Sequence, residues 1–128
     1  MQKVMIVDDS AAVRLEIIKI LKEHYMIVEA VDGADAVQKA KDNKDIELVI
    51  LDYNMPKMDG LSAAQRIRAQ KPHSNTSMIM LTTESNTIMK QRAKEIGIIA
   101  WVVKPINAKN LMGVIDKIFE RRSHKVAS

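Results

Sequence analysis

Residues 48–60 read Leu-Val-Ile-Leu-Asp-Tyr-Asn-Met-Pro-Lys-Met-Asp-Gly. Four apolar residues end in a carboxylate, Asp52, and a segment rich in turn-forming residues follows. An uninterrupted apolar run that is bounded by turn residues is typical of a buried strand in a parallel sheet. This strand therefore delivers a charged side chain to the loop that follows it.

Two other apolar runs of the chain end in the same way. Residues 4–7 lead into Asp8 and Asp9, and residues 98–103 lead into Lys104. In an open parallel α/β sheet, ligands bind in the crevice outside the carboxyl ends of the strands. Three carboxylates and one ammonium at that edge indicate a site for a divalent cation and a phosphoryl group.

Predicted strands and helices alternate along the chain. Apolar runs predict strands at 4–7, 26–30, 48–51, 78–82 and 98–103. Apolar residues at helical spacing follow each run, with Ser10 and Asn107 placed to cap the first and last helix and Gly97 placed to end the fourth. This alternation favours an α/β fold with a parallel sheet covered on both faces. We expect one domain over residues 1–122 and a short frayed tail over residues 123–128.

The composition of the 128 residues argues against several classes of protein. Cysteine is absent, so no disulfide framework exists. No apolar run approaches the ~18 residues of a membrane span, and the N-terminus lacks a signal-peptide pattern, so we expect a cytoplasmic protein with no membrane partner. The net charge of +4 comes from the last third of the chain. Because aromatic residues make up only 3% and no dense Lys/Arg cluster occurs, we interpret this charge as a solvated basic face or a contact for an acidic protein, and not as a nucleic-acid site.

The side chains at the strand ends also carry a family resemblance. Four features have the order and the intervals of a response-regulator receiver domain: carboxylates at 8–9, Asp52, Thr82, and Lys104 with a proline after it. Over residues 2–120 the chain resembles this family, and most of all its single-domain chemotaxis regulators of the CheY type. The resemblance implies a flavodoxin-like (βα)5 fold, a doubly wound parallel sheet with the strand order 2-1-3-4-5 that is known for CheY itself.

The resemblance also implies the chemistry of the site. Asp52 is expected to be the phosphoacceptor, because a carboxylate can act as a nucleophile and form an aspartyl-phosphate. Asp9 and Asp52 are expected to bind Mg²⁺ directly, with Mn²⁺ as a substitute. Asp8 is expected to hold a metal-bound water, and the backbone carbonyl of Asn54 to complete the ligands. The alternative for the 8–9 pair is a helix N-cap. Lys104 is expected to pair with Asp52 before phosphorylation and with a phosphate oxygen after it.

Four further side chains are expected to respond to the phosphoryl group or to control it. Thr82 offers a hydroxyl to a phosphoryl oxygen; Thr83 is a competing candidate, and the family's interval favours Thr82. Trp101 occupies the family's switch-aromatic position, usually Tyr or Phe, and is expected to move inward as Thr82 moves; the alternative is a fixed aromatic. Asn54 and Glu84 match the chemotaxis regulators at positions beside the path of the attacking water, and they are expected to give the aspartyl-phosphate a short lifetime.

These features predict a stand-alone response regulator of a two-component system, in a chemotaxis role. It is expected to be a phosphoacceptor that assists its own phosphorylation and dephosphorylation, and not an enzyme. As a monomer it is expected to signal through the face that the fourth helix, the fifth strand and the fifth helix form. The resemblance implies three partners: a CheA-type histidine kinase, a flagellar motor switch protein and a phosphatase.

Three other functions fit parts of the pattern. The nearest is a phosphorelay intermediate that passes the phosphoryl group to a histidine phosphotransfer protein. A metal-dependent phosphatase with an aspartyl-phosphate typically has a second Asp two residues after the nucleophile, where Asn54 stands. A flavin-binding module needs a phosphate loop after the first strand, where Asp8 and Asp9 repel a phosphate.

Overall fold

The computed structural model describes residues 1–84 and 86–127, with side chains as far as Arg122. Within these ranges five strands and five α-helices alternate. The strands are β1 (Lys3–Val7), β2 (Met26–Ala30), β3 (Ile46–Asp52), β4 (Ser77–Thr82) and β5 (Ala100–Val103). The helices are α1 (Ala11–Leu21), α2 (Gly33–Asp42), α3 (Gly60–Arg68), α4 (Thr87–Ile96) and α5 (Ala108–Ala127), with a 3₁₀ turn η1 at Lys71–His73.

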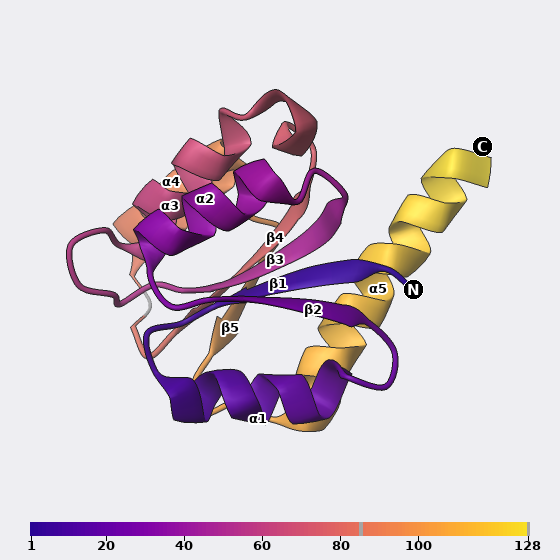
Figure 1. Cartoon of the computed structure of the whole chain (residues 1–128), viewed down its shortest axis with the longest axis horizontal. Coiled ribbons are helices and arrows are strands. Elements are labelled where there is room, and N and C mark those ends of the chain that lie inside the picture. The colour runs from indigo at the N-terminus through magenta and orange to yellow at the C-terminus, as the bar shows by residue number, and fades with distance from the viewer. Residues whose placement is uncertain (85, 128) are drawn as a thin grey trace.

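The strands form one parallel sheet in the order β2-β1-β3-β4-β5. Helices α1 and α5 cover one face of this sheet, and α2, α3 and α4 cover the other (Figure 1). The structure confirms the expected flavodoxin-like (βα)5 doubly wound fold and its strand order. A connection between parallel strands must cross over a face, and the helices on both faces bury the central strands β1, β3 and β4.

Strand β1 shows how an uninterrupted apolar run serves both faces. Met5 and Val7 lie in the core cluster under α2 and α3, and Val4 and Ile6 lie in the cluster under α1 and α5. All four side chains are fully buried. Successive side chains of a strand point to opposite faces, so a strand with helices on both sides needs apolar residues at every position.

Polar side chains fix where the helices begin. Five side chains each accept a hydrogen bond from a backbone N–H in the first turn of the next helix, at 2.7–3.3 Å. They are Ser10, Asp32, Asp59, Asn86 and Asn107. Such caps satisfy backbone donors that have no partner within the helix. The loops at the carboxyl edge of the sheet are therefore held at their far ends, and this holds the side chains that they carry.

Several boundaries differ from those that we predicted. Strands β1 and β4 begin one residue earlier, and β3 runs over Ile46–Asp52 instead of residues 48–51. Strand β5 begins at Ala100 and not at Ile98, because Gly97 (φ 94°) ends α4 in the left-handed conformation and Ile98 donates its N–H to the Ala93 carbonyl at 2.9 Å. The expected tail is helical through Ala127, since α5 continues to that residue, and Ser128 lies outside the described residues. The boundary of the domain at residue 122 stays a prediction.

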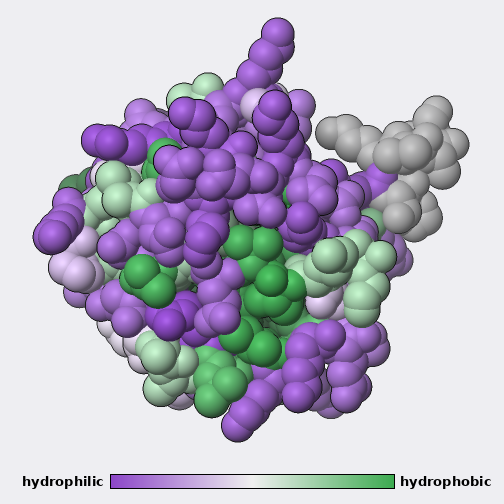
Figure 2. Space-filling view, in the orientation of Figure 1, coloured by the Kyte–Doolittle hydropathy of each residue, from purple (hydrophilic) through white to green (hydrophobic). Residues whose placement is uncertain are grey.

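Strand β2 forms a free edge of the sheet and is only partly covered. Met26 is exposed and Ile27 and Val28 are half-buried. Figure 2 shows hydrophobic surface in the middle of the face where β2 runs in Figure 1.

None of the described helices is both long enough and apolar enough to cross a membrane.

Candidate functional site

Three charged residues and Thr82 meet at the carboxyl edge of the three central strands and of β5. Asp8 follows β1, Asp52 is the last residue of β3, Thr82 is the last residue of β4, and Lys104 follows β5. The strands run in register at this end, with Asp52 beside Leu81. The sheet therefore brings together residues that are up to 96 positions apart in the chain.

Lys104 joins two of the carboxylates. Its Nζ donates to Asp52 Oδ1 at 2.9 Å and to Asp8 Oδ2 at 3.2 Å. Asp8 and Asp52 are buried, with exposed fractions of 1% and 4%, so water compensates little of their charge. The structure confirms the expected pairing of Lys104 with Asp52, and it adds Asp8 to the pair. The Lys104–Pro105 peptide bond is cis.

Burial and charge act together on the protonation of this pair. Burial raises the pKa of Asp52, and the negative charges of Asp8 and Asp9 act in the same direction, while the hydrogen bond from Lys104 opposes the rise. For Lys104, burial favours the neutral amine, but the hydrogen bond from Lys104 to Asp52 and the charge of Asp8 outweigh it and raise its pKa. The lysine therefore stays charged, and one ammonium faces three carboxylates.

The three carboxylates form a cluster that could hold a metal ion. Oxygen atoms of Asp8, Asp9 and Asp52 lie within 4.8 Å of one another. Asp8 and Asp52 are buried, and Asp9 is exposed at the rim. Carboxylate oxygens are the ligands that Mg²⁺ prefers, and a divalent cation removes the repulsion within such a group. The donor set therefore fits a hard divalent cation.

Asp8 is not the N-cap of α1, which was the alternative to a metal role. Ser10 is the N-cap, and its hydroxyl accepts from the Val13 N–H. Asp8 instead accepts the Ser10 N–H at Oδ1, 2.8 Å away, and this bond turns the chain out of β1. Asp9 stays available at the rim.

The backbone around Asp52 is tightly packed. Tyr53 donates its N–H to the Leu81 carbonyl at 2.8 Å, and Gly60 donates its N–H to the Tyr53 carbonyl at 2.9 Å. A Cβ on Gly60 would collide with the carbonyl oxygen of Asp52 and approach the Tyr53 Cα to 2.9 Å. Only glycine fits this approach, so α3 begins directly against the strand that carries Asp52. Asn54 is exposed in the loop between them.

Thr82 and Trp101 lie on adjacent strands beside the site. Thr82 is fully buried and its hydroxyl oxygen accepts the Glu84 N–H at 3.0 Å, whereas Thr83 is exposed. Burial at the end of the strand thus favours Thr82 over Thr83 as the residue of the site. Trp101 is half-buried and packs against the cluster under α2, α3 and α4, and its indole Nε1 is buried with no hydrogen-bond partner among the described residues. Glu84 is exposed.

One further side chain contacts the site and was missed in the sequence. Arg14, on α1, donates from Nη1 to the Asp8 carbonyl at 2.8 Å and from Nε to Glu29 Oε1 at 3.1 Å. The only signal for it is an arginine one turn after the Ser10 N-cap, and arginines are common there. The contact to the backbone became visible only with the fold.

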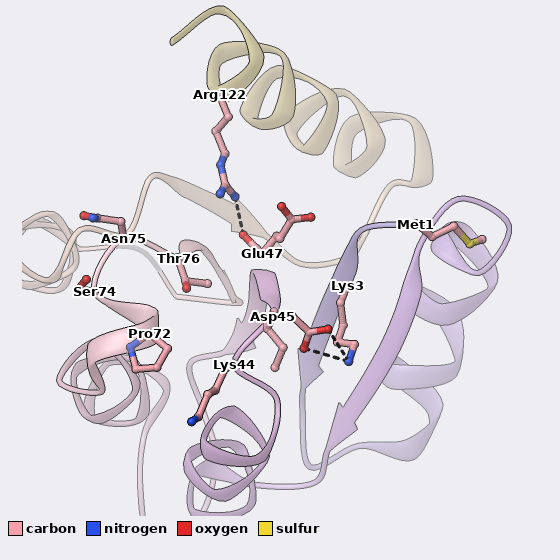
Figure 3. Close-up of a pocket in the computed structure, with 11 residues that line it drawn as sticks. Met1, Lys3, Lys44, Asp45, Glu47, Pro72, Ser74, Asn75, Thr76 and Arg122 are labelled. Atoms are coloured by element: carbon pink, nitrogen blue, oxygen red, sulfur yellow. Dashed lines mark hydrogen bonds and ion pairs between the residues drawn. The ribbon is translucent and has the colours of Figure 1, made fainter. Parts of the chain in front are cut away.

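A polar pocket of about 540 Å³ lies at the opposite edge of the sheet (Figure 3). Three of its charged side chains have partners in the pocket: Lys3 pairs with Asp45 at 3.0 Å, and Arg122 donates to the backbone carbonyl of Glu47 at 2.9 Å. This edge has no counterpart of the three clustered carboxylates in the part of the chain that the structure describes. The carboxyl edge is therefore the better candidate for the functional site.

Comparison with known proteins agrees with this geometry. The family described as response regulator receiver domain matches residues 4–116. The chemotaxis protein CheY homolog of Campylobacter jejuni is 31% identical over 118 residues, covering 91% of each chain. The structure of the chemotaxis protein CheY4 of Vibrio cholerae superposes with a TM-score of 0.87 at 35% identity, covering 91% of this chain and 98% of that one.

A third likeness is to a protein solved in a complex. It is the CheX–CheY–BeF3–Mg complex from Borrelia burgdorferi, with a TM-score of 0.85 and 29% identity, covering 92% of this chain and 89% of that chain. Four findings indicate the same family of proteins: the strand order, the acidic cluster, the position of Lys104 and these three likenesses. The chain thus belongs to the response regulator receiver domain family, and it is similar to the CheY chemotaxis proteins of that family.

Proposed function

We propose that this receiver accepts a phosphoryl group on Asp52 and passes the signal to a protein target in chemotaxis. The observation that carries the proposal is the buried Asp52 carboxylate, 2.9 Å from the ammonium of Lys104 and within 4.8 Å of Asp8 and Asp9. The chemotaxis role rests on the names of several relatives, among them the chemotaxis proteins of Campylobacter jejuni and Vibrio cholerae.

In the proposed transfer, the donor is a phosphohistidine of a CheA-type histidine kinase. A carboxylate oxygen of Asp52 forms a bond to phosphorus while the bond from phosphorus to the imidazole nitrogen breaks, and the electron pair stays on that nitrogen. Burial raises the pKa of Asp52, and the hydrogen bond from Lys104 opposes this rise and so favours the ionised, nucleophilic form of the carboxylate. After transfer the ammonium can follow the negative charge to a phosphoryl oxygen.

The acidic cluster supports a role for Mg²⁺. Asp9 and Asp52 would hold the ion, Asp8 would hold its water, and the Asn54 carbonyl would add a ligand. When bound, the ion neutralises charge on the phosphoryl oxygens. Mn²⁺ takes the same kind of oxygen ligands and is expected to substitute.

The proposed switch uses Thr82 and Trp101. The Thr82 hydroxyl accepts a hydrogen bond from the Glu84 N–H, and its own hydrogen is available for a phosphoryl oxygen. In this proposal, movement of Thr82 leaves room for the indole of Trp101. The indole N–H has no hydrogen-bond partner among the described residues, so no hydrogen bond opposes its movement. The face of α4, β5 and α5 then changes.

The output is contact with other proteins. Ile88 on α4, Ile99 directly before β5 and Val103 at the end of β5 expose 76%, 55% and 52% of their surface. In this proposal, a flagellar motor switch protein contacts these apolar side chains. A phosphatase is the third proposed partner. The receiver itself is not an enzyme in this proposal, and it acts as a monomer in the cytoplasm, a compartment that the absence of cysteine fits.

Labelling with acetyl phosphate tests the proposal directly. We expect covalent labelling of the protein in Mg²⁺, none in EDTA and none for Asp52→Asn. Labelling at another carboxylate, or labelling that persists in EDTA, would contradict it. Phosphotransfer from a panel of purified histidine kinases then identifies the donor, and a pull-down with the phosphate-mimic-activated protein identifies the target.

A further inference from the structure

Each polar group of Asp8 takes part in a hydrogen bond. Its N–H donates to the Ala30 carbonyl at 3.2 Å, its Oδ1 accepts from Ser10, and its Oδ2 accepts from Lys104. The remaining group is the backbone carbonyl, and it accepts from Arg14 at 2.8 Å. Arg14 is therefore the side chain that completes the environment of this residue.

The carbonyl that Arg14 holds belongs to the peptide unit that joins Asp8 to Asp9. That unit is planar, so a bond to its oxygen also sets the direction in which the chain enters Asp9. Asp9 itself is exposed at the rim, and the orientation of its carboxylate depends on the backbone below it.

The guanidinium of Arg14 is itself fixed. Its side chain is only 14% exposed, and its Nε donates to the Glu29 carboxylate of β2 at 3.1 Å. A planar guanidinium can serve two acceptors in fixed directions, which a lysine ammonium on a flexible stem does less well.

We propose that Arg14 is a positioning residue of the cation site: it holds the Asp8–Asp9 peptide so that both carboxylates face Asp52. The inference rests on the proposed function of that cluster. Residues that orient metal ligands from outside the ligand set commonly change metal affinity on the order of tenfold when they are replaced.

Charge and geometry predict opposite signs for the loss of Arg14. If the positive charge were its only effect, then removing it would strengthen the binding of a cation at the acidic cluster. If Arg14 orients the peptide, then removing it weakens that binding although the repulsion is gone. The sign of the change in Mg²⁺ affinity thus separates the two roles.

The test compares four variants of the full chain. Arg14→Met removes the charge and the donors, and Arg14→Lys keeps the charge but loses the planar donor pair. Glu29→Gln keeps a neutral acceptor for the Arg14 Nε–H. Lys19→Met removes a charge from the exposed side of the same helix and controls for net charge.

The first readout is Mg²⁺ binding, followed by the amide NMR signals of residues 8–10 and 52–54. We expect about tenfold weaker binding for Arg14→Met and a severalfold loss for Arg14→Lys. Glu29→Gln and Lys19→Met should bind within about twofold of the wild type. Tighter or unchanged binding in folded Arg14→Met would overturn the proposal.

The second readout is the rate of labelling by acetyl phosphate as Mg²⁺ is raised. In Arg14→Met the half-saturating Mg²⁺ concentration should rise while the rate at saturation recovers, which a general loss of folding would not produce. A lower plateau with an unchanged half-saturating concentration would also overturn the role. A wild-type protein that neither binds Mg²⁺ nor becomes labelled would instead contradict the proposed function, and the inference with it.

Discussion

The two sides of the site are built differently. On the β1–β3 side, Asp8 and Asp52 are buried, and both accept hydrogen bonds from Lys104. Gly60 allows α3 to begin directly against the backbone of Asp52. On the β4–β5 side, α4 buries only Met89 and Ala93, while Ile88 is 76% exposed. A tightly determined half can hold reacting groups, and a loosely covered half can change its shape at low cost.

One contact limits how α4 can move. The Arg68 guanidinium donates to the carbonyls of Ile96 and Gly97 at the end of α4, at 3.2 and 3.3 Å. It also donates to the carbonyl of His73, the last residue of η1, at 3.0 Å and to that of Thr76 at 2.6 Å. It therefore fixes the C-terminal end of α4. At the N-terminal end of α4, Asn86, Thr87 and Ile88 are exposed, so we expect this end to move more easily than the anchored C-terminal end.

The largest expected effect tests the rigid side. Gly60→Ala places a Cβ against the Asp52 carbonyl and should lower the free energy of unfolding by roughly 3 kcal/mol, the upper range for overpacking. Urea melts measure it. Gly113→Ala is the matched control, because nothing lies within 4 Å of its Cβ, and it should stabilise helix α5 by about 0.5–1 kcal/mol. Equal effects of the two substitutions would remove the contrast in packing.

The next effect tests the fixed end of α4. Arg68→Met leaves four backbone carbonyls without their donor and should lower the free energy of unfolding by roughly 2 kcal/mol, because hydrogen bonds from charged groups are strong but the site is partly hydrated. Arg66→Met, which removes an exposed charge from the same helix, should change it by less than about 0.5 kcal/mol. Similar urea midpoints for the two variants would mean that Arg68 does not anchor α4.

A smaller effect tests the charge of the cluster. In the absence of metal, Asp9→Ala should stabilise the fold by on the order of 1 kcal/mol, because it removes repulsion between carboxylates. It should also lower the pKa of Asp52, since one of the charges that raise that pKa is gone. Urea melts and an NMR titration measure the two changes, with Glu23→Ala, an exposed carboxylate, as the control. A lower midpoint would show that Asp9 supports the fold more than it strains it.

The smallest expected effect in free energy concerns the lifetime of the phosphoryl group. Asn54 and Glu84 are both exposed beside the site, where they can admit a water, and we expect a lifetime of seconds to a few minutes. Replacing them with Met and Leu should lengthen it at least severalfold, since a tenfold change needs only about 1.4 kcal/mol. The measurement is loss of label from the purified protein. A wild-type lifetime of hours would favour the phosphorelay alternative.

Much of the fold follows from local patterns in the sequence. The apolar runs predicted the strands, because a doubly covered parallel strand needs apolar residues at each position, and Ser10 and Asn107 cap the helices that they were expected to cap. Asp52, Thr82 and Lys104 meet because each ends or follows a strand of the same sheet. The strand order came from the family resemblance, since local patterns do not determine which strands are neighbours.

Contacts of long side chains with distant backbone could not be predicted. Arg14 and Arg68 both donate to main-chain carbonyls, which every residue carries, so no partner residue reveals them. The sharing of Lys104 between Asp52 and Asp8 depends on distances in the folded sheet. Strand β5 begins only at Ala100 because the Ile98 N–H bonds to the Ala93 carbonyl at the end of α4. An apolar run does not show whether a residue belongs to the strand or to the end of the preceding helix.

We propose that a phosphoryl group on Asp52 leaves the β1–β3 side unchanged and remodels the β4–β5 side. Hydrogen exchange of the wild type, with and without acetyl phosphate in Mg²⁺, tests it, and Asp52→Asn under the same conditions is the control. We predict altered exchange in the first turn of α4 and in β5, little change in strands β1 and β3, and no change in the control. Exchange that changes only in the loops next to Asp52, or changes equally in Asp52→Asn, would show that phosphorylation does not remodel the β4–β5 side.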